Sequence, residues 1–277
     1  MSLPRPTLEA VLREAGSIAV AVSGGVDSVT LAALSHRVLG SDHALMVHAV
    51  SPAVPAEATD RVRAQAQRDG WTLRVIDAGE FADPRYRANP VNRCFFCKTN
   101  LYGAVATVTG LQIVSGANTS DLGEYRPGLD AARDHAVRHP YVEAGFDKAA
   151  VRALARDLGL GEEIAELPAA PCLSSRVETG ISIAPETLDF IHAVERLVAS
   201  SLGAEAGRGR AVRCRVRGSG IVVELDSLSF QALDVAQRGV LAAQIVARAP
   251  VGLSRGAVSF APYRTGSAFL TGHGTKP

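Results

Sequence analysis

The stretch SIAVAVSGGVDSVTLAALSHRVLG, residues 17–40, decides the fold. Its first six residues form an apolar run typical of a buried strand, and the apolar segment after the glycines is typical of a helix ending at Gly40. Two glycines let the backbone turn tightly, and N–H groups at the start of a helix bind anions such as phosphate. An ordinary turn with a helix-capping serine explains the glycines equally well. The stretch therefore predicts strand, turn and helix, with a candidate phosphate site at the turn.

Strand-like and helix-like segments alternate through the first half of the chain. Such alternation predicts an α/β fold in which helices cover both faces of a parallel sheet. Ligands of such sheets bind beyond the carboxyl ends of the strands, where SGGVDS and SGANTSD both lie. The further predicted strands are 44–50, 72–78, 111–117 and a short one at 139–145, and the predicted helices are 56–70 and 147–160.

The pattern changes after the proline-rich stretch LPAAPCLSSR, residues 167–176. We expect a nucleotide-binding domain over residues 1–176 and a smaller α/β domain over residues 177–277, which would serve substrate binding and oligomerisation. The predicted elements of the second domain are a helix at 186–203, strands at 211–218 and 221–226, a helix at 230–249 and a last strand at 257–263.

The composition favours a soluble globular protein that acts on small molecules. In 277 residues, 29 Lys and Arg face 28 Asp and Glu, so no overall positive field attracts nucleic acid, and a nucleic-acid partner is not expected. The first residues lack the pattern of a signal peptide, and no stretch is long and apolar enough for a membrane span. We therefore expect a cytoplasmic protein, whose thiols stay reduced.

The residues of SGGVDS suggest how the turn would bind a nucleotide. Ser23 and Ser28 offer hydroxyl groups, whereas Asp27 would repel phosphate and suits the accompanying Mg²⁺. The stretch lacks the lysine of G-x-x-x-x-G-K-[ST] and does not fit G-x-G-x-x-G. It resembles the SGGxDS loop of the PP-loop ATP pyrophosphatases, which split ATP between the α and β phosphates and adenylylate a substrate. That resemblance assigns Ser23, Gly24, Gly25, Asp27 and Ser28 to pyrophosphate and Mg²⁺.

Three further stretches resemble the LarE family of ATP-dependent sulfur transferases within this superfamily. They are CKTNLY (97–102), SDLGEYRPGL (120–129), and PCLSSR (171–176) followed by an arginine-rich strand. That family adenylylates a carboxylate of a pyridinium dicarboxylate mononucleotide and replaces it by a thiocarboxylate, a step in making a nickel-pincer cofactor. The resemblance implies ATP and the mononucleotide as ligands, a catalytic site that includes Cys172, Asp27 and Lys98, and a homo-oligomer.

Strand AVRCRVRG carries a candidate anion site. Period-two alternation places three arginines on one face and Val212, Cys214 and Val216 on the other, which predicts a cationic face and a core face. Arginine suits bidentate phosphate binding. The resemblance assigns Arg213 and Arg215, with Ser175, to the substrate phosphate, and Arg217 is expected at the surface. The full set of predicted substrate residues is Glu124, Arg126, Ser175, Arg176, Arg213, Arg215 and Glu224.

Several of these residues also have simpler explanations. Glu224 would pair with one of the arginines, and Lys98 would be exposed rather than meet phosphate or a carboxylate. Glu124 and Arg126 would belong to an ordinary turn with the following Pro-Gly. Asp121, at the tip of the strand at 111–117, is equally explained as a helix cap.

The cysteines raise the question of the sulfur source. With Cys214 in the core, Cys94, Cys97 and Cys172 remain, one short of a closed tetrahedral zinc site but enough to hold a [4Fe–4S] cluster by three irons. Some LarE-type proteins have a single reactive cysteine that gives up its own sulfur. This chain carries an additional Cys-x-x-Cys, which favours the cluster. Sacrifice of the Cys172 sulfur is the alternative, and a zinc knuckle comes third.

Two other functions compete with a sulfur transferase acting on a mononucleotide. A PP-loop tRNA thiolase uses the same activation step, although the balanced charge and the absence of an aromatic-rich basic module count against it. A nucleotide-binding sensor with a structural zinc knuckle would show no turnover.

Overall fold

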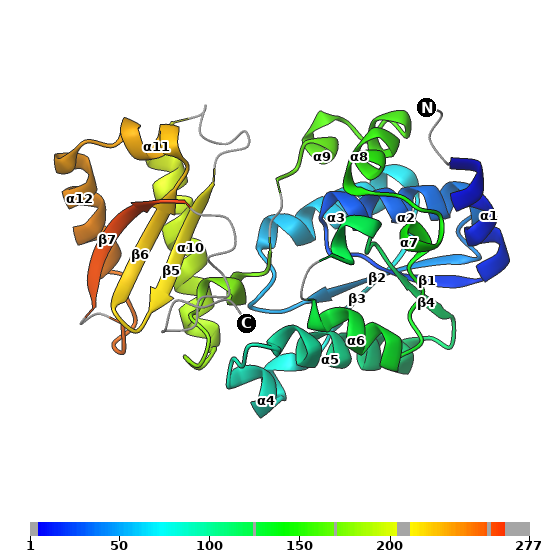
Figure 1. Ribbon diagram of the computed structural model, residues 1–277, viewed down its shortest axis with the longest axis horizontal. Helices are drawn as coiled ribbons and strands as arrows, with labels where there is room; N and C mark the ends of the chain where they lie inside the picture. The colour runs from blue at the N-terminus through cyan, green and yellow to red at the C-terminus, as the bar shows by residue number, and fades with distance from the viewer. Residues whose placement is uncertain (1–4, 124–125, 169–170, 204–210, 254–255, 264–277) are drawn as a thin grey trace. The chain divides into compact units, whose positions relative to one another are not determined.

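The computed structural model describes residues 5–123, 126–168, 171–203, 211–253 and 256–263 (Figure 1). The packing of the chain separates two compact units. Unit 1 comprises Met1–Asp83 and Asn92–Ala170, and unit 2 comprises Pro84–Val91 and Pro171–Pro277. A short segment between the two parts of unit 1 therefore belongs to unit 2.

Unit 1 is built on a four-stranded sheet of order β3-β2-β1-β4 in which every pairing is parallel. The predicted α/β fold is confirmed. The chain moves from β1 outward to β3 and then returns to add β4 on the other side of β1, so the strand order reverses between β1 and β4. Such a reversal is where open α/β sheets bind ligands. The strands are β1 (Ile18–Ala21), β2 (Ala44–Val50), β3 (Thr72–Asp77) and β4 (Gln112–Ser115).

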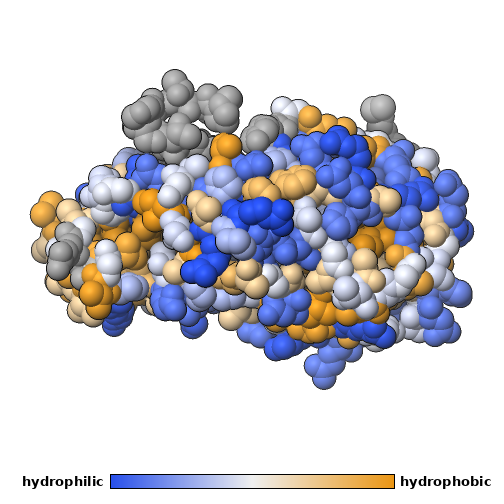
Figure 2. All heavy atoms as spheres, turned by 90° about the horizontal axis from the view of Figure 1, so that it is seen from below, coloured by the Kyte–Doolittle hydropathy of each residue, from blue (hydrophilic) through white to orange (hydrophobic). Residues whose placement is uncertain are grey.

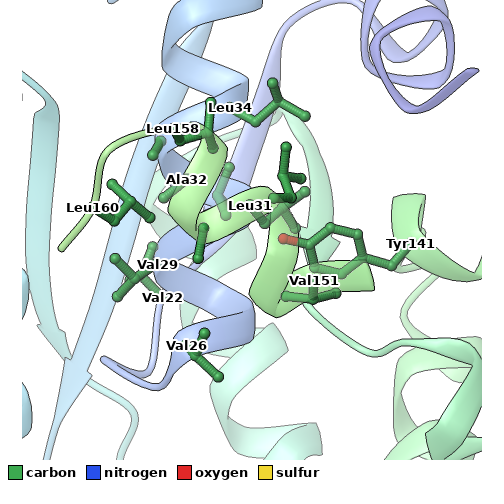
Figure 3. Close-up of a cluster of buried hydrophobic side chains, with 14 of the residues drawn as sticks. Val22, Val26, Val29, Leu31, Ala32, Leu34, Tyr141, Val151, Leu158 and Leu160 are labelled. Carbon is green, nitrogen blue, oxygen red and sulfur yellow. The ribbon is translucent and has the colours of Figure 1, made fainter. Parts of the chain in front are cut away.

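Helices cover both faces of this sheet, as the alternation predicted (Figure 1). Ile18 and Val20 join the core beneath α1, α2, α3 and α8, whereas Ala19 joins a second core beneath α5 and α6. Figure 3 shows the first core, where α2 packs against α8 through side chains such as Leu31 and Val151. The helices are α1 (Arg5–Ala15), α2 (Val26–Leu39), α3 (Ala56–Asp69), α5 (Arg93–Val108), α6 (Pro127–Asp134) and α8 (Lys148–Asp157).

The strand predicted at 139–145 is wrong, because this segment forms the short helix α7 (Pro140–Glu143). Proline lacks an N–H group and suits the first turn of a helix, which is where Pro140 lies. Arg138 alone forms a bridge to Val114 of β4. The apolar side chains of the segment are buried against α1 instead of in the sheet. Unit 1 also contains α9 (Glu162–Ala165) and the 3-10 turns η1 (Glu80–Ala82) and η2 (Thr119–Asp121).

Unit 2 contains a smaller mixed sheet of order β5-β6-β7. Strands β5 and β6 are antiparallel, and β6 and β7 are parallel. Helix α10 packs on β5, and its buried residues form one face of the helix. This agrees with the predicted smaller α/β region. The elements are α4 (Pro84–Arg87), η3 (Leu173–Arg176), α10 (Pro185–Ser201), β5 (Val212–Arg217), β6 (Gly220–Leu225), α11 (Ser227–Ala232), α12 (Val235–Val246) and β7 (Ala257–Pro262).

The single helix predicted at 230–249 is wrong, because two helices, α11 and α12, occupy this region. Asp234 begins α12 with a capping box: its side chain accepts from the Gln237 N–H, and the Gln237 side chain accepts from the Asp234 N–H. A capping box satisfies N–H groups at a helix start and so favours a new helix at that point.

Unit 2 holds the segment Pro84–Val91 by polar contacts. Tyr86 is buried, and its hydroxyl lies 2.6 Å from Ser174 Oγ. Asn89 is fully buried, and its side-chain amide donates to the carbonyl groups of Val177, Glu178 and Ile181. These contacts fix the segment to the PCLSSR stretch and the residues that follow it.

Exposed apolar side chains lie on α11 and α12 of unit 2. The face drawn in Figure 2 also carries hydrophobic residues among hydrophilic ones. Val235 is 84% exposed, Leu228 67% and Val240 59%. No helix among the residues placed by the structure is long and apolar enough to cross a membrane. The expected homo-oligomerisation stays a prediction.

Candidate active site

The predicted phosphate loop lies between the end of β1 and the start of α2. Gly25 is the N-cap of α2, so the first-turn N–H groups of this helix, which lack acceptors inside the helix, lie in the loop. The Ser23 N–H donates to Ser28 Oγ over 3.1 Å, and the two hydroxyl oxygens are 3.1 Å apart. The loop is therefore closed by its own serines and presents amides for an anion.

Gly24 is required by both conformation and space. Its φ of +84° is in the region that favours glycine, and an added Cβ would lie 2.6 Å from the carbonyl oxygen of Ala58 in α3. The neighbouring Gly25 has a φ of −82°, and its added Cβ would meet nothing closer than 3.7 Å. The first glycine therefore permits the contact between the loop and α3, whereas the second has room for a methyl group in this structure.

We expect Gly24→Ala to lower the free energy of unfolding by more than the roughly 1–2 kcal/mol that a left-handed conformation costs a non-glycine residue. The contact with Ala58 adds to that cost because backbone atoms must move. Gly16→Ala is the control, since its φ is +69° and its added Cβ would meet nothing within 4 Å. Urea unfolding of both variants measures the difference. Equal losses in the two variants would contradict the close contact.

Asp27 lies in the first turn of α2, opposite the end of β4. Asn118 donates from its side-chain amide to Asp27 Oδ1 over 3.2 Å, and the Asn118 N–H donates to Asp121 Oδ2 over 3.1 Å. An added Cβ on Gly116 would lie 3.0 Å from backbone atoms of Asp27 and Ser28, so β4 and α2 approach closely here. Two carboxylates from neighbouring strand ends are thus linked through one asparagine.

The charges around Asp27 are mixed. Burial raises the pKa of Asp27, the nearby carboxylate of Asp121 raises it further, and Lys148 and Arg152 of α8 oppose this effect. The buried Tyr141 hydroxyl donates to the Asp27 carbonyl over 3.1 Å. A bound cation would relieve the repulsion between the two carboxylates. The sequence analysis did not single out Asn118, Lys148 or Arg152, because none of them belongs to the recognised loop.

Asp121 also connects the predicted EYRPG stretch to this site. Arg126 lies 2.9 Å from Asp121 Oδ1, so one predicted substrate residue is near the loop. Asn118 begins a capping box in which Asp121 is the N3 residue, so the simpler role of Asp121 in helix capping is confirmed. One carboxylate oxygen of Asp121 serves the capping box and the other contacts Arg126. Glu124 lies outside the described residues.

Lys98 lies on the first half of α5. A Cβ added to Gly128 would lie 3.1 Å from Lys98 Cγ, so the two residues are close. The Lys98 ammonium is 5.9 Å from the centre of the Tyr102 ring. Its charge also lowers the pKa of His139, although burial is the larger cause. His139 Nδ1 is 2.9 Å from the Ser115 hydroxyl at the end of β4. Lys98 is therefore near the carboxyl edge of the sheet, and its catalytic role stays a prediction.

The two cysteines of CFFC lie near the start of α5, three residues apart and hence on one side of the helix. Both side chains are half-buried. Their spacing of three residues is compatible with two ligands of one metal or cluster. In the part of the chain that the structure places, no group of three or more His, Cys, Asp or Glu is arranged to hold a metal ion. Cys172 belongs to unit 2, whereas Cys94 and Cys97 belong to unit 1.

Unit 2 brings together several of the predicted substrate residues. Arg215 and Glu224 are both buried; Arg215 Nε donates to Glu224 Oε2 over 3.0 Å and Arg215 NH1 donates to the Ser175 carbonyl over 2.8 Å. The predicted pairing of Glu224 with an arginine is confirmed. Arg217, which was expected at the surface, is partly exposed and also donates to Glu224, over 2.6 Å.

Arg213 completes this cluster. It is half-buried, donates to the Val212 carbonyl, and lies 6.0 Å from the centre of the Tyr263 ring. Burial lowers its pKa, and the positive charges of Arg176 and Arg215 lower it further. Cys214 faces the core, as predicted, where burial raises its pKa strongly. The alternation along β5 is therefore confirmed, and one side of the strand concentrates positive charge.

Arg176 fixes the backbone around Cys172. Its buried guanidinium pairs with Glu195 over 3.0 Å and donates to the carbonyl groups of Pro171 and Cys172 and to Ser175 Oγ. The Ser175 N–H also donates to the Cys172 carbonyl. The predicted role of Arg176 in substrate binding thus stands beside an observed role in holding the cysteine segment.

We expect Arg215→Ala to destabilise unit 2 by about 3–5 kcal/mol, because Glu224 would keep a buried charge with one less partner. Arg217→Ala is the matched control, since it removes the more exposed partner of the same carboxylate, with a side chain 30% exposed. Its expected cost is about 1 kcal/mol. Urea unfolding measures both values, and similar losses would contradict the buried pairing.

The chain is similar to proteins of several organisms. An uncharacterised protein of Synechocystis is 39% identical over 180 residues, which cover 64% of this chain and 66% of that protein. Pyridinium-3,5-bisthiocarboxylic acid mononucleotide synthase of Lactiplantibacillus plantarum is 27% identical over 204 residues, 72% of this chain and 73% of the relative. A tRNA-specific 2-thiouridylase of Gluconobacter oxydans is 34% identical over 194 residues, 54% of this chain and 52% of the relative.

No protein-family model matches the chain. The aligned segments span just under two thirds of the Synechocystis protein and about half of the thiouridylase. The characterised relatives are PP-loop enzymes that use ATP, and they support that superfamily and an ATP-dependent enzyme. Sulfur transfer, in the broad sense, is supported by the similarity to the mononucleotide synthase.

Proposed function

We propose that this chain is an ATP-dependent sulfur transferase of the LarE type. It would adenylylate a carboxylate of pyridinium-3,5-dicarboxylate mononucleotide and convert it to a thiocarboxylate for a nickel-pincer cofactor. The proposal places the enzyme in the cytoplasm, as a homo-oligomer acting on a small molecule and not on nucleic acid. Its nucleotide-binding domain is proposed over residues 1–176 and its substrate domain over residues 177–277.

The observation that supports this function most is the cluster in unit 2. Ser175, Arg213 and Arg215 were assigned to one substrate phosphate, and they are neighbours although about 40 residues separate the serine from the arginines along the chain. Arg215 contacts the same short turn that carries Cys172. A phosphate bound by these residues would therefore lie near the segment that carries Cys172. Glu124, Arg126 and Glu224 complete the proposed substrate residues.

The first step would be attack of the substrate carboxylate on the α-phosphorus of ATP. Pyrophosphate would leave into the loop formed by Ser23, Gly24, Gly25 and Ser28, where amides stabilise its charge. The acyl-adenylate that remains is a better electrophile than the carboxylate. A sulfur nucleophile would then add to the acyl carbon and AMP would leave, which exchanges one carboxylate oxygen for sulfur.

Mg²⁺ fits the acidic side of the loop, because Asp27 and Asp121 are linked through Asn118 and the charge of Asp121 adds to burial in raising the pKa of Asp27. Asp27 would be the direct ligand. When bound there, Mg²⁺ supplies positive charge to the polyphosphate. Lys98 is proposed to meet a phosphate or the substrate carboxylate from the same edge of the sheet.

The sulfur is proposed to come from sulfide on a [4Fe–4S] cluster held by Cys94, Cys97 and Cys172. The paired thiols on α5 suit two of these ligands. When bound, the cluster would supply a place for sulfide, and the three cysteines would hold it. The alternative is donation of the Cys172 sulfur itself, which would leave dehydroalanine after one turnover, and a zinc knuckle without turnover is the third case.

Pyrophosphate release from MgATP tests the proposed function. We expect release that depends on the pyridinium mononucleotide under reducing, anaerobic conditions. Absence of release with every substrate offered would favour a nucleotide-binding sensor. The similarity to a tRNA thiouridylase makes tRNA the competing substrate. Retention of bulk tRNA on a filter at sub-micromolar protein and physiological salt, with release stimulated by tRNA, would contradict the mononucleotide assignment.

A further inference from the structure

Helix α3 packs directly on the phosphate loop, although none of its residues belongs to the recognised motif. The carbonyl of Ala58 occupies the space that a side chain on Gly24 would need. The buried His48 of β2 joins the two elements: its Nδ1 lies 2.8 Å from the Val22 carbonyl, and its Nε2 lies 2.9 Å from Thr59 Oγ1. Burial lowers the pKa of His48. The first turns of α3 are therefore held in a fixed position beside the loop.

Arg61, one turn farther along α3, reaches the loop itself. Its Nε donates to the Gly24 carbonyl over 2.8 Å, and its NH1 donates to the Glu57 carbonyl over 3.3 Å. A guanidinium carries five N–H donors, so these two contacts leave further donors for a ligand. Gly24 is one of the residues assigned to pyrophosphate, and the cation is thus attached to the backbone of the anion site.

Among the residues that the structure places, Glu57 is the one carboxylate whose charge opposes the lowered pKa of Arg61. The contacts of Arg61 are with backbone carbonyl groups, and no carboxylate of the described residues forms an ion pair with it. Burial lowers its pKa, and the charge of Glu57 opposes this effect only in part. A half-buried cation without a paired carboxylate is costly unless an anion joins it. The anion expected at this place is a polyphosphate.

We infer that Arg61 is a further polyphosphate-binding residue, which α3 places at the loop and the Gly24 carbonyl orients toward the pyrophosphate portion of ATP. This inference rests on the proposed function, because it takes the loop as the ATP site. Arg61 would add a cation to the loop SGGVDS, which has no lysine or arginine of its own. Arg61 therefore plays the part that a lysine plays in other phosphate loops.

Binding of inorganic pyrophosphate and of AMP, each measured by calorimetry with excess Mg²⁺, tests the inference. Arg61→Met should weaken pyrophosphate binding at least about tenfold, the effect of losing a charge-assisted hydrogen bond, and leave AMP binding unchanged. Arg61→Lys should recover part of the loss because it keeps the charge. Arg63→Met is the matched control: it removes the same charge from an exposed position on the same helix and should bind both ligands like the wild type.

Unchanged pyrophosphate binding in Arg61→Met, with normal binding in the wild type and in Arg63→Met, would overturn the inference alone. Equal losses for pyrophosphate and AMP, together with a lower unfolding temperature, would show that Arg61 only supports the loop, and this would also overturn it. No recovery in Arg61→Lys would contradict the role of charge. A wild-type protein that binds neither pyrophosphate nor ATP would contradict the proposed function itself.

Discussion

Asp27→Asn is expected to reduce pyrophosphate release from MgATP by about a hundredfold or more, the loss typical of removing a preorganised electrostatic contact to a reacting group. The change is nearly isosteric. Asparagine can still accept the hydrogen bond that Asn118 donates, so the loop should keep its shape. What is lost is the negative charge that would hold Mg²⁺. Assays of pyrophosphate release over a range of Mg²⁺ concentrations measure the effect.

The control for this variant is Asp42→Asn, which makes the same chemical change at an exposed turn before β2. It should leave both activity and unfolding temperature unchanged. Asp27→Asn should also unfold at or above the wild-type temperature, because it removes a half-buried charge that repels Asp121. Wild-type activity in Asp27→Asn would refute the assignment of the loop to ATP and Mg²⁺.

Replacement of any one of the three candidate ligand cysteines by serine should abolish repeated turnover. If Cys94, Cys97 and Cys172 hold one cluster, each of the three variants should also lose the brown iron–sulfur absorption after anaerobic reconstitution, since serine is a poor ligand for it. Iron and acid-labile sulfide analysis measures the cluster, and product formed per enzyme measures turnover. The expected result is the same for all three positions.

Cys214→Ala is the control, because Cys214 is buried in the core of unit 2 and alanine adds no polar group there. This variant should keep the cluster and the turnover. The alternative route, donation of the sulfur of Cys172 itself, predicts a different result. A wild-type protein that binds no iron, and in which Cys172 alone loses the elements of hydrogen sulfide during a single turnover, would establish sacrificial sulfur donation and reject the cluster.

The parallel sheet could be predicted because its strands are short apolar runs, each followed by a turn and a helix. The run at 44–50 became β2 with the same limits. The segment 139–145 was wrongly predicted as a strand because it is short. In so few residues the spacing of apolar side chains cannot distinguish a strand from a helix. The break between the two helices in 230–249 had a signal in the sequence, the D-x-x-Q of Asp234 and Gln237, which form a capping box. Apolar residues on both sides of this signal favoured one continuous helix instead.

The candidate site was predictable only where a motif carried it. SGGVDS identified the loop, and the alternation along β5 identified the side that carries Arg213 and Arg215. The contribution of α3 had no signal in the sequence, because Arg61 and Gly24 are 37 positions apart along the chain. The attachment of Pro84–Val91 to unit 2 depends in the same way on distant partners of Asn89. Contacts of this kind arise from the assembled fold.

The central claim is that ATP cleavage drives exchange of a carboxylate oxygen for sulfur. Mass spectrometry of the pyridinium mononucleotide, after incubation with MgATP and anaerobically purified protein, tests it most directly. We predict a product in which one oxygen is replaced by sulfur, formed together with one AMP and one pyrophosphate. Cleavage of ATP without sulfur in the mononucleotide, or sulfur found only in tRNA, would contradict the claim.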